Sequence, residues 1–298
     1  MKTSLSYRQS KARMGLLFTL PGLCFVTVYM IYPLITSFYY SFSDYNFVYS
    51  LRPKLNGIKN YIAAFKDPIF LLSMKNTFVF ATFYFLIVMI FGLIVALLLF
   101  YYKGNSYLFK TMIFMPIVVP LSLASILFNW IFSENFGLLN YIIGSVFHLP
   151  QLTFGWLTHR STAMVAIISV TIWSSVGFIA ILFLAGLQSI STEILEAALI
   201  DGASTRRTIF SIILPNLHET YIIAGIWAIL RGMKIYAPPM VMTGGAPGNA
   251  TRVMYMHIYD NAFEYFEMGY ASALGFILSI IVLFFSYLNM RLSTEKEG

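Results

Sequence analysis

Six long apolar runs limit what this sequence can fold into. A helix that crosses the hydrocarbon core of a bilayer needs about 20 mostly apolar residues. Only 10% of the 298 residues are charged, against about 25% in soluble domains. The sequence therefore predicts an all-α, polytopic membrane protein. Its six transmembrane helices are expected over residues 14–41, 77–102, 108–132, 162–187, 220–242 and 269–290.

The charged segments favour a cytoplasmic N-terminus. Basic residues from Lys2 to Arg13 precede the first run, which is too long for a secretory signal and is followed by no small-residue cleavage site. An even number of spans then places both ends, residues 1–13 and 291–298, in the cytoplasm. Lysine and arginine are only modestly enriched on that side, so the orientation also rests on the short basic loop between Lys103 and Lys110.

The sequence lacks the motifs by which enzymes, metalloproteins and nucleotide-binding proteins are recognised. The net charge of +7 indicates contact with anionic lipid, and we expect no nucleic-acid partner. No P-loop pattern occurs, because the glycine-rich 243–247 segment lacks the lysine. Cys24 has no second cysteine to pair with, and the four histidines show no metal spacing. We therefore expect no enzymatic activity, no metal and no cofactor in this chain.

The segment from Ser191 to Pro215 carries both charge signs between two apolar runs, so it must lie in water at the membrane surface. Ser191 or Thr192 is placed to cap a short helix. Gly202 stands where a left-handed residue would end that helix, and Ser204 can cap a second one that Pro215 ends. The pattern predicts two short amphipathic helices joined at a glycine.

Two cations, Arg231 and Lys234, fall near the middle of the fifth predicted span. A separation of three residues puts them on one helix face, and ionisable groups at that depth are candidates for a functional site. Gly232, Pro238 and Pro239 favour an interrupted helix, as in many transport pathways. The two cations would then favour an anionic solute. Alternatively, the span is shifted so that both cations reach an interface or pair with a carboxylate elsewhere in a complex.

Two aromatic residues, Trp227 and Tyr236, accompany these cations. Their rings could stack on a sugar, although aromatic side chains in a helical bundle more often serve packing. We take Trp227, Arg231, Lys234 and Tyr236 as the candidates for the substrate pathway.

The central segment reads EAALIDGA from Glu196 to Ala203 and is followed by Ile212, Leu214 and Pro215. It resembles the EAA signature of ABC importer permeases. Further stretches are similar to sugar-importer permeases of the maltose and glycerol-phosphate type, and the similarity covers nearly the whole chain. These stretches include LLFTLPGLCFVTVYMIYPLITSFYYSF, NYIAAFKDPIF, FMPIVVPLSLASILFNWIF, VMTGGAPGNAT and GYASALGFIL.

This resemblance implies a permease subunit in a prokaryotic plasma (inner) membrane, with the type I ABC importer transmembrane-domain fold over residues 14–290. It implies four partners: a second homologous permease, an ATPase dimer that binds the ATP, an extracytoplasmic solute-binding protein, and a sugar or oligosaccharide as substrate. The loop at about 191–215 would couple to the ATPase. The residues that match the signature, and that the resemblance assigns to this contact, are Glu196, Ala197, Ala198, Asp201, Gly202 and Ala203.

Two alternatives remain open at this point. The carboxylates Glu196 and Asp201 could instead cap helices or pair with Arg206 or Arg207. For the whole protein, the alternative is a secondary transporter driven by an ion gradient. Against it stand the EAA loop and the lack of carboxylates within the spans.

Substrate charge is a separate question. Many members of the family carry Phe-Asp shortly before the TGG loop, whereas this chain has Tyr236 and Ala237 there. This departure puts a neutral sugar in doubt and favours an acidic or modified one.

Overall fold

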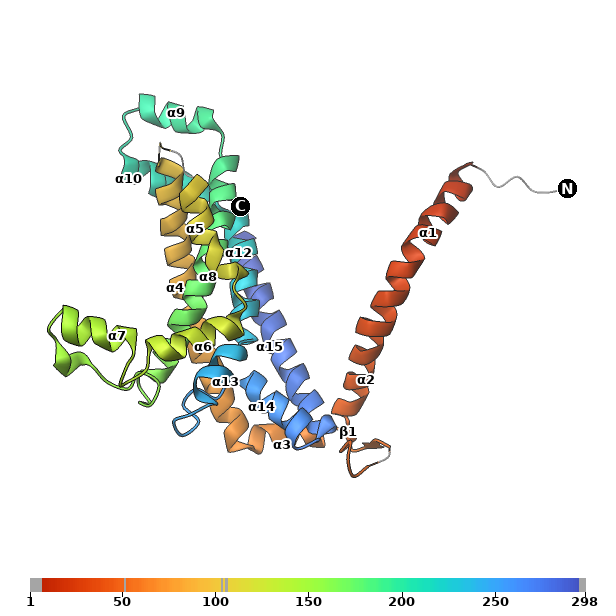
Figure 1. Cartoon of the computed structure of the whole chain (residues 1–298). Coiled ribbons are helices and arrows are strands. Elements are labelled where there is room, and N and C mark those ends of the chain that lie inside the picture. Colours follow the sequence, from red (N-terminus) through yellow and green to blue (C-terminus); the bar gives the residue numbers. More distant parts are fainter. Residues whose placement is uncertain (1–6, 51, 103, 105–106, 295–298) are drawn as a thin grey trace. The chain divides into compact units, whose positions relative to one another are not determined.

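The computed structural model describes residues 7–50, 52–102, 104 and 107–294, and it is helical over most of its length (Figure 1). Some residues on which the predicted orientation and the C-terminal tail rest lie outside the described residues: Lys2, Lys103 and residues 295–298. The chain forms two compact units. Unit 1 comprises the chain up to Lys66 together with Ile258–Phe276, and unit 2 comprises Asp67–His257 and the chain from Ile277 onward.

Unit 1 begins with one continuous helix that covers the first predicted span. A β-hairpin and a short helix follow it. The Asn60 amide donates to the carbonyls of Ser41 (3.0 Å) and Ser43 (2.9 Å), which ties the short helix to the hairpin. The elements are α1 (Tyr7–Val26), a π-helical turn η1 (Thr27–Ile31), α2 (Tyr32–Ser41), β1 (Ser43–Asp44), β2 (Lys54–Leu55) and α3 (Lys59–Lys66).

A later part of the chain completes unit 1. It contains the π-helical turn η5 (Asp260–Glu264) and the start of α15 (Met268–Thr294). The N–H of Gly269 donates to the Tyr45 carbonyl over 3.0 Å. A Cβ at position 269 would collide with the Ser43 carbonyl oxygen, so only glycine allows this close approach.

The core of unit 2 is built from α4 (Pro68–Tyr101), α8 (Ala163–Ser189) and α12 (His218–Met233). Small residues let these helices approach closely, as is usual in membrane bundles. A Cβ added at Gly92 of α4 would lie 2.9 Å from Cβ of Ile179 in α8. The largest fully buried side chains of this core include Phe80, Tyr84, Ile167, Ile179 and Phe183.

The helices of unit 2 are sharply bent at two places. The third predicted span consists of α5 (Tyr107–Val118) and α6 (Leu121–Ile131), which meet at an angle of 97°. Pro120 takes the N-cap position of α6, so the chain turns where a proline interrupts the hydrogen bonding. A second bend, of 69°, lies just before the fifth predicted span, where the helical stretch Thr205–Asn216 meets His218–Thr243. Within the described residues, four helices are long and apolar enough to cross a membrane, or up to six if each bent pair is one span.

The boundaries of two predicted spans need correction. The second helix starts at Pro68 rather than at residue 77, because the Asp67 carboxylate caps it by accepting from the N–H of Ile69 over 2.8 Å. The fifth span does not run unbroken from 220 to 242. α12 stops at Met233, and α13 (Ala237–Thr243) begins after a break.

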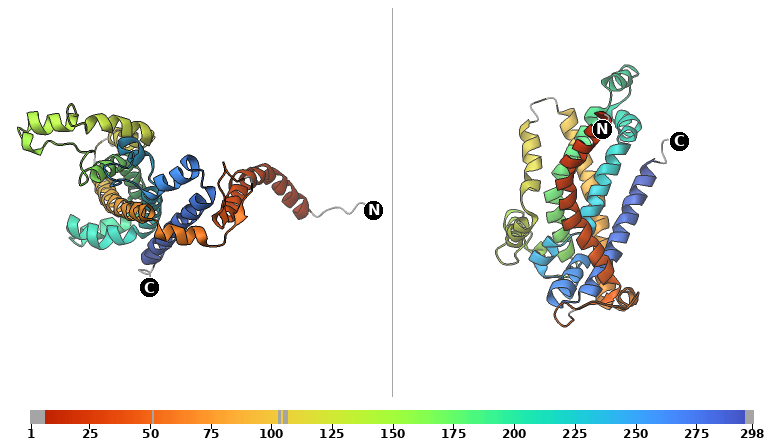
Figure 2. Two further views of the ribbon diagram at one scale, coloured as in Figure 1. Left: turned by 90° about the horizontal axis from the view of Figure 1, so that it is seen from below. Right: turned by 90° about the vertical axis from the view of Figure 1, so that its right-hand side faces the viewer.

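Short helices connect the spans of unit 2. Between α6 and α8 lie α7 (Leu138–Tyr141), the π-helical turn η2 (Ile142–Val146) and the 3-10 turn η3 (Pro150–Leu152). Between α8 and α12 lies the predicted surface segment. Its helix α9 (Thr192–Ile200) stands at one end of the unit, and α6 and α13 lie toward the other (Figures 1 and 2).

Candidate functional site

The segment predicted as a surface loop folds as two short capped helices, which we call the coupling loop (residues 191–216). The first is α9, and the Ser191 hydroxyl accepts from the N–H of Glu193 over 3.2 Å at its start. The Ser204 hydroxyl caps the second helix by accepting from the N–H of Arg207 over 3.4 Å. Both predicted caps are confirmed. The second helix is formed by α10 (Thr205–Thr208), the π-helical turn η4 (Ile209–Ile213) and α11 (Leu214–Asn216).

Gly202 makes the corner between the two helices. Its φ of +72° lies in the left-handed region, as the sequence predicts. The N–H of Gly202 donates to the Leu199 carbonyl (3.1 Å), and the N–H of Ala203 donates to the Ala198 carbonyl (2.9 Å). This pair of bonds is the Schellman motif, which satisfies the last carbonyls of a helix and fixes its exit direction.

The second helix ends at Asn216, one residue after the Pro215 that was predicted to end it. In a regular α-helix, the ring of a proline clashes with the carbonyl group four residues earlier. Here the wider π-helical turn η4 lies just before it, with the N–H of Leu214 donating to the Ile209 carbonyl. The helix therefore passes Pro215 and breaks at Leu217.

The coupling loop presents apolar side chains to solvent. Leu199 is 73% exposed and Ile200 is 85% exposed, whereas Ala198 is only 7% exposed. Among the predicted coupling residues, Glu196, Ala197, Asp201 and Gly202 are also exposed, and Ala203 is half-buried. Within the described residues, neither Glu196 nor Asp201 forms an ion pair with Arg206 or Arg207.

The four candidates for the substrate pathway line a single pocket of about 640 Å³, which we call the pathway pocket. α12 contributes Trp227 and Arg231 at its end, and the break after α12 contributes Lys234 and Tyr236. The full lining is Leu121, Trp227, Leu230, Arg231, Lys234, Ile235, Tyr236, Ala237 and Tyr255.

The predicted interruption of the fifth span forms this pocket. Lys234 is the last residue with a helical hydrogen bond, from its N–H to the Leu230 carbonyl over 3.2 Å. The chain then turns at Tyr236, and Pro238 lies in the first turn of α13, where its missing N–H costs nothing. Gly232 brings α12 close to α4, since a Cβ there would lie 3.2 Å from Cα of Ala81.

Arg231 is held by contacts from two helices. Its Nη2 donates to the hydroxyl of Ser174 in α8 over 2.8 Å. Its guanidinium carbon lies 5.1 Å from the centre of the Trp227 ring, within the range of a cation–π interaction. Trp227 in turn packs on Phe178, with ring centres 4.6 Å apart. Trp227 thus has a packing role in the structure, the commoner of the two roles weighed for it.

Sequence reasoning missed every residue that other helices contribute to this site: Ser174, Phe178, Tyr255 and Leu121. It also missed Leu230 and Ile235 beside the predicted candidates. A hydroxyl pair at 174–175 in an apolar helix is a signal that could have pointed to Ser174, because polar side chains in membrane helices often bind across to a neighbour. Tyr255, whose ring centre is 5.7 Å from that of Tyr236, belongs to α14 (Met254–Tyr259) and carries no comparable signal.

The glycine-rich loop after α13 is a turn fixed to α4. Gly244 and Gly245 have φ values of +58° and +88°, which glycine adopts without strain. The Asn76 amide donates to the carbonyls of Asn249 (2.8 Å) and Arg252 (2.9 Å). The loop therefore sets where α14, and with it Tyr255, begins.

The polar pair nearest the start of α4 serves a structural role. His257 Nε2 lies 3.0 Å from Oδ2 of Asp67, the residue that caps α4. The part of the chain that the structure describes contains no group of three or more His, Cys, Asp and Glu side chains that could hold a metal ion.

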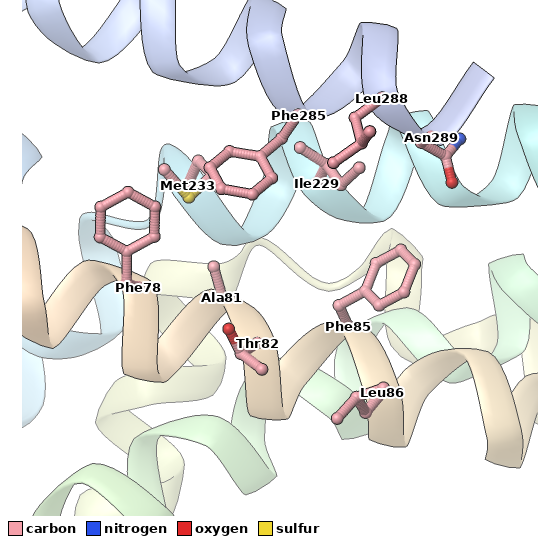
Figure 3. Close-up of a pocket in the computed structure, with 10 residues that line it drawn as sticks. All are labelled: Phe78, Ala81, Thr82, Phe85, Leu86, Ile229, Met233, Phe285, Leu288 and Asn289. Carbon is pink, nitrogen blue, oxygen red and sulfur yellow. The ribbon is translucent and has the colours of Figure 1, made fainter. Parts of the chain in front are cut away.

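A second pocket of about 350 Å³ lies between α4, α12 and α15 (Figure 3). It has no charged residue in its lining, and its amide, Asn289, donates to the Ile222 carbonyl over 3.2 Å. An apolar groove of this kind suits a lipid chain or an apolar helix and does not suit a polar solute. The pathway pocket is therefore the better candidate for transport.

Comparison with known proteins gives a consistent family match. The model of the family described as "Binding-protein-dependent transport system inner membrane component" matches residues 68–294. The chain is 33% identical over 284 residues to the probable ABC transporter permease protein YurN of Bacillus subtilis (strain 168), covering 94% of this chain and 96% of that protein. It is also 33% identical over 273 residues to the diacetylchitobiose uptake system permease protein NgcF of Streptomyces coelicolor, covering 86% of this chain and 74% of that protein.

A solved structure has the same fold. It is a bacterial ABC transporter involved in the import of the acidic polysaccharide alginate, with a TM-score of 0.82 and 19% identity over 96% of this chain and 98% of that one. The predicted ABC importer transmembrane-domain fold is thereby confirmed. The predicted coupling and pathway residues stay predictions.

Proposed function

Because this chain belongs to the family of inner-membrane components of binding-protein-dependent transport systems, we propose that it forms half of the translocation pathway of an ATP-driven importer for a sugar or oligosaccharide. A relative that is 33% identical to this chain is named for diacetylchitobiose uptake, which supports the sugar class. The alternative of an ion-gradient-driven transporter finds no support among these relatives.

The observation that carries coupling to an ATPase is the exposed apolar tip of α9. Leu199 and Ile200 are mostly exposed on a loop that also carries both charge signs. Apolar side chains held out in this way by capped, rigid helices mark an interaction surface. An ATPase subunit, which binds the ATP, receives this tip, and the rigid corner at Gly202 transmits its motion to α8 and the second helix of the loop.

The proposal extends to the orientation and the other partners. The coupling loop lies in the cytoplasm of a prokaryotic cell, and both termini, including residues 1–13 and 291–298, lie on the same side of the inner membrane. The permease domain extends over residues 14–290. A second, homologous permease completes the pathway, and an extracytoplasmic solute-binding protein delivers the sugar from the opposite side.

Co-purification tests the coupling proposal. Tagged protein, extracted from its native membrane, is expected to bring with it an ATPase that hydrolyses ATP. Replacing Leu199 and Ile200 together by aspartate is expected to reduce the recovered ATPase at least tenfold, because two charges replace the apolar contact. Phe136→Asp is the matched control, since Phe136 is 77% exposed but lies on the α6–α7 connection.

The control variant is expected to retain the ATPase. Purification of the wild-type protein alone, together with uptake that an ionophore abolishes, would instead establish the secondary transporter. Full recovery of the ATPase with the aspartate pair would show that α9 is not its docking element.

A further inference from the structure

We propose that the pathway pocket selects solutes that carry a negative charge, with Arg231 and Lys234 as the groups that bind the anion. The inference deepens the proposed function and rests on it: the solute would be an acidic sugar, whose carboxylate or related anionic group meets the two cations while its ring meets the aromatic residues.

The lining of the pathway pocket carries a net positive charge. Arg231 and Lys234 are part of the pocket lining, which contains no carboxylate. Within the described residues, no Asp or Glu forms an ion pair with either cation. Two positive charges in one pocket, surrounded by apolar side chains, raise the local concentration of anions.

Arg231 is positioned without being neutralised. Ser174 is an uncharged acceptor and takes one N–H of the guanidinium, which has five N–H donors in all. Its Nε is buried and has no hydrogen-bond partner among the described residues. The guanidinium is therefore fixed in direction by Ser174 and Trp227 and keeps unused donors. A carboxylate is the acceptor that matches such a planar group.

Lys234 complements this fixed group. It is exposed at the break after α12, so its flexible stem can follow the solute. Both cations occupy the last turn of α12 or the residue that ends it. The partial negative charge of a helix C-terminus favours cations there, which explains how the protein tolerates two of them so close together.

The rest of the lining suits a sugar. Tyr236 and Tyr255 come together with a ring-centre distance of 5.7 Å, and each combines an apolar face with a hydroxyl group. The volume of about 640 Å³ falls within the range of about 300–1,000 Å³ typical of small-molecule sites. The pocket therefore joins an aromatic surface to a fixed cation, which a neutral sugar would leave unpaired.

The test uses the purified importer complex and two matched probes, digalacturonic acid and its uncharged dimethyl ester. Binding is measured by calorimetry and by quenching of tryptophan fluorescence, which Trp227 reports from within the pocket. We expect the acid to bind at least tenfold more tightly than the ester, with a preference that shrinks as salt is added.

The variants assign that preference to the pocket. Arg231→Gln with Lys234→Gln is expected to abolish the preference while the affinity for the ester changes less than twofold. Lys234→Gln alone, which leaves the buried contacts of Arg231 intact, is expected to weaken acid binding about threefold to tenfold, as for the loss of one hydrogen bond of ordinary strength at an exposed position. Arg52→Gln with Lys54→Gln removes the same charge from exposed residues of unit 1 and is expected to keep the full preference.

Equal binding of both probes to the wild-type protein, including no measurable binding of either, overturns the proposal, as does a preference that survives in the double variant. Neither outcome contradicts the proposal that the protein is an importer subunit, because that proposal is tested separately by co-purification of the ATPase. A carboxylate of the second permease that neutralises the pocket would appear as equal binding.

Discussion

Valine in place of Gly202 is expected to lower ATP-driven uptake at least tenfold while the permease remains folded and inserted. Gly202 has a φ of +72°, and the left-handed region costs an ordinary residue about 1–2 kcal/mol, more for a β-branched one. No heavy atom lies within 4 Å of an added Cβ, so nothing in the chain resists the side chain itself. The strain is relieved by moving the corner, and α9 then presents Leu199 and Ile200 in the wrong direction.

The measurement is solute uptake together with the amount of ATPase that co-purifies. Gly57→Val is a matched control, because Gly57 has a φ of +66° and equally open surroundings but lies between β2 and α3 in unit 1. The Gly57→Val variant should have the same local backbone strain but normal uptake and normal recovery of the ATPase. Asparagine tolerates the left-handed region, so Gly202→Asn separates backbone geometry from close approach of a partner. Normal uptake by Gly202→Val would contradict the role of this corner.

Substitution of Gly177 is expected to give the largest loss of stability. A Cβ at this position would lie 2.8 Å from the carbonyl carbon of Ile113 and 3.3 Å from Cα of Phe114, both in the backbone of α5. Side chains can rotate away from an intruding methyl group, but a helix backbone must move as a whole. Overpacking typically costs 1–3 kcal/mol, and we expect the upper end of that range for Gly177→Ala and loss of the folded protein for Gly177→Leu.

Thermal unfolding in detergent, followed by size-exclusion chromatography, measures this effect. A cost of about 3 kcal/mol corresponds to a fall in Tm of roughly 6–12 °C for a protein of this size class. Gly22→Ala is the control, since Gly22 lies within α1 and has no heavy atom within 4 Å of an added Cβ. An unchanged Tm for Gly177→Ala would show that α5 does not pack on α8 in this way.

Loss of the α5–α8 contact also bears on transport. α5 leads through the 97° bend into α6, whose first residue, Leu121, lines the pathway pocket. A small residue at position 177 thus supports the position of one wall of the site, although it lies outside the site itself.

The coupling loop could be predicted almost completely because its structure is local. Ser191, Gly202 and Ser204 each act on backbone groups within five residues of themselves. Caps and left-handed corners depend on the side chain and the conformation of single residues, so the sequence is sufficient to place them. The one local error was the end of the second helix, which was predicted at Pro215. It arose because the π-helical turn η4 has no recognisable sequence signal.

The pathway pocket could be predicted only in part. Arg231 and Lys234 were found because charge in an apolar run is costly wherever it lies, and the break between α12 and α13 was found from its prolines. The sequence does not show which residues of other helices lie opposite Arg231 and Lys234. Ser174 meets Arg231 across 57 residues of chain, and Tyr255 reaches the pocket only because the glycine-rich loop starts α14 where Asn76 holds it.

By itself, the sequence determined that this protein is a bundle of membrane helices with a capped, charged loop at the surface, because hydrophobic length and helix capping are properties of contiguous residues. Only the tertiary structure decided that α5 and α6 turn by 97° and that two cations share a pocket lined without a carboxylate. Both depend on which helices pack together. In a membrane that choice rests on close fit between small residues such as Gly92 and Gly177, which a uniformly apolar pattern does not reveal.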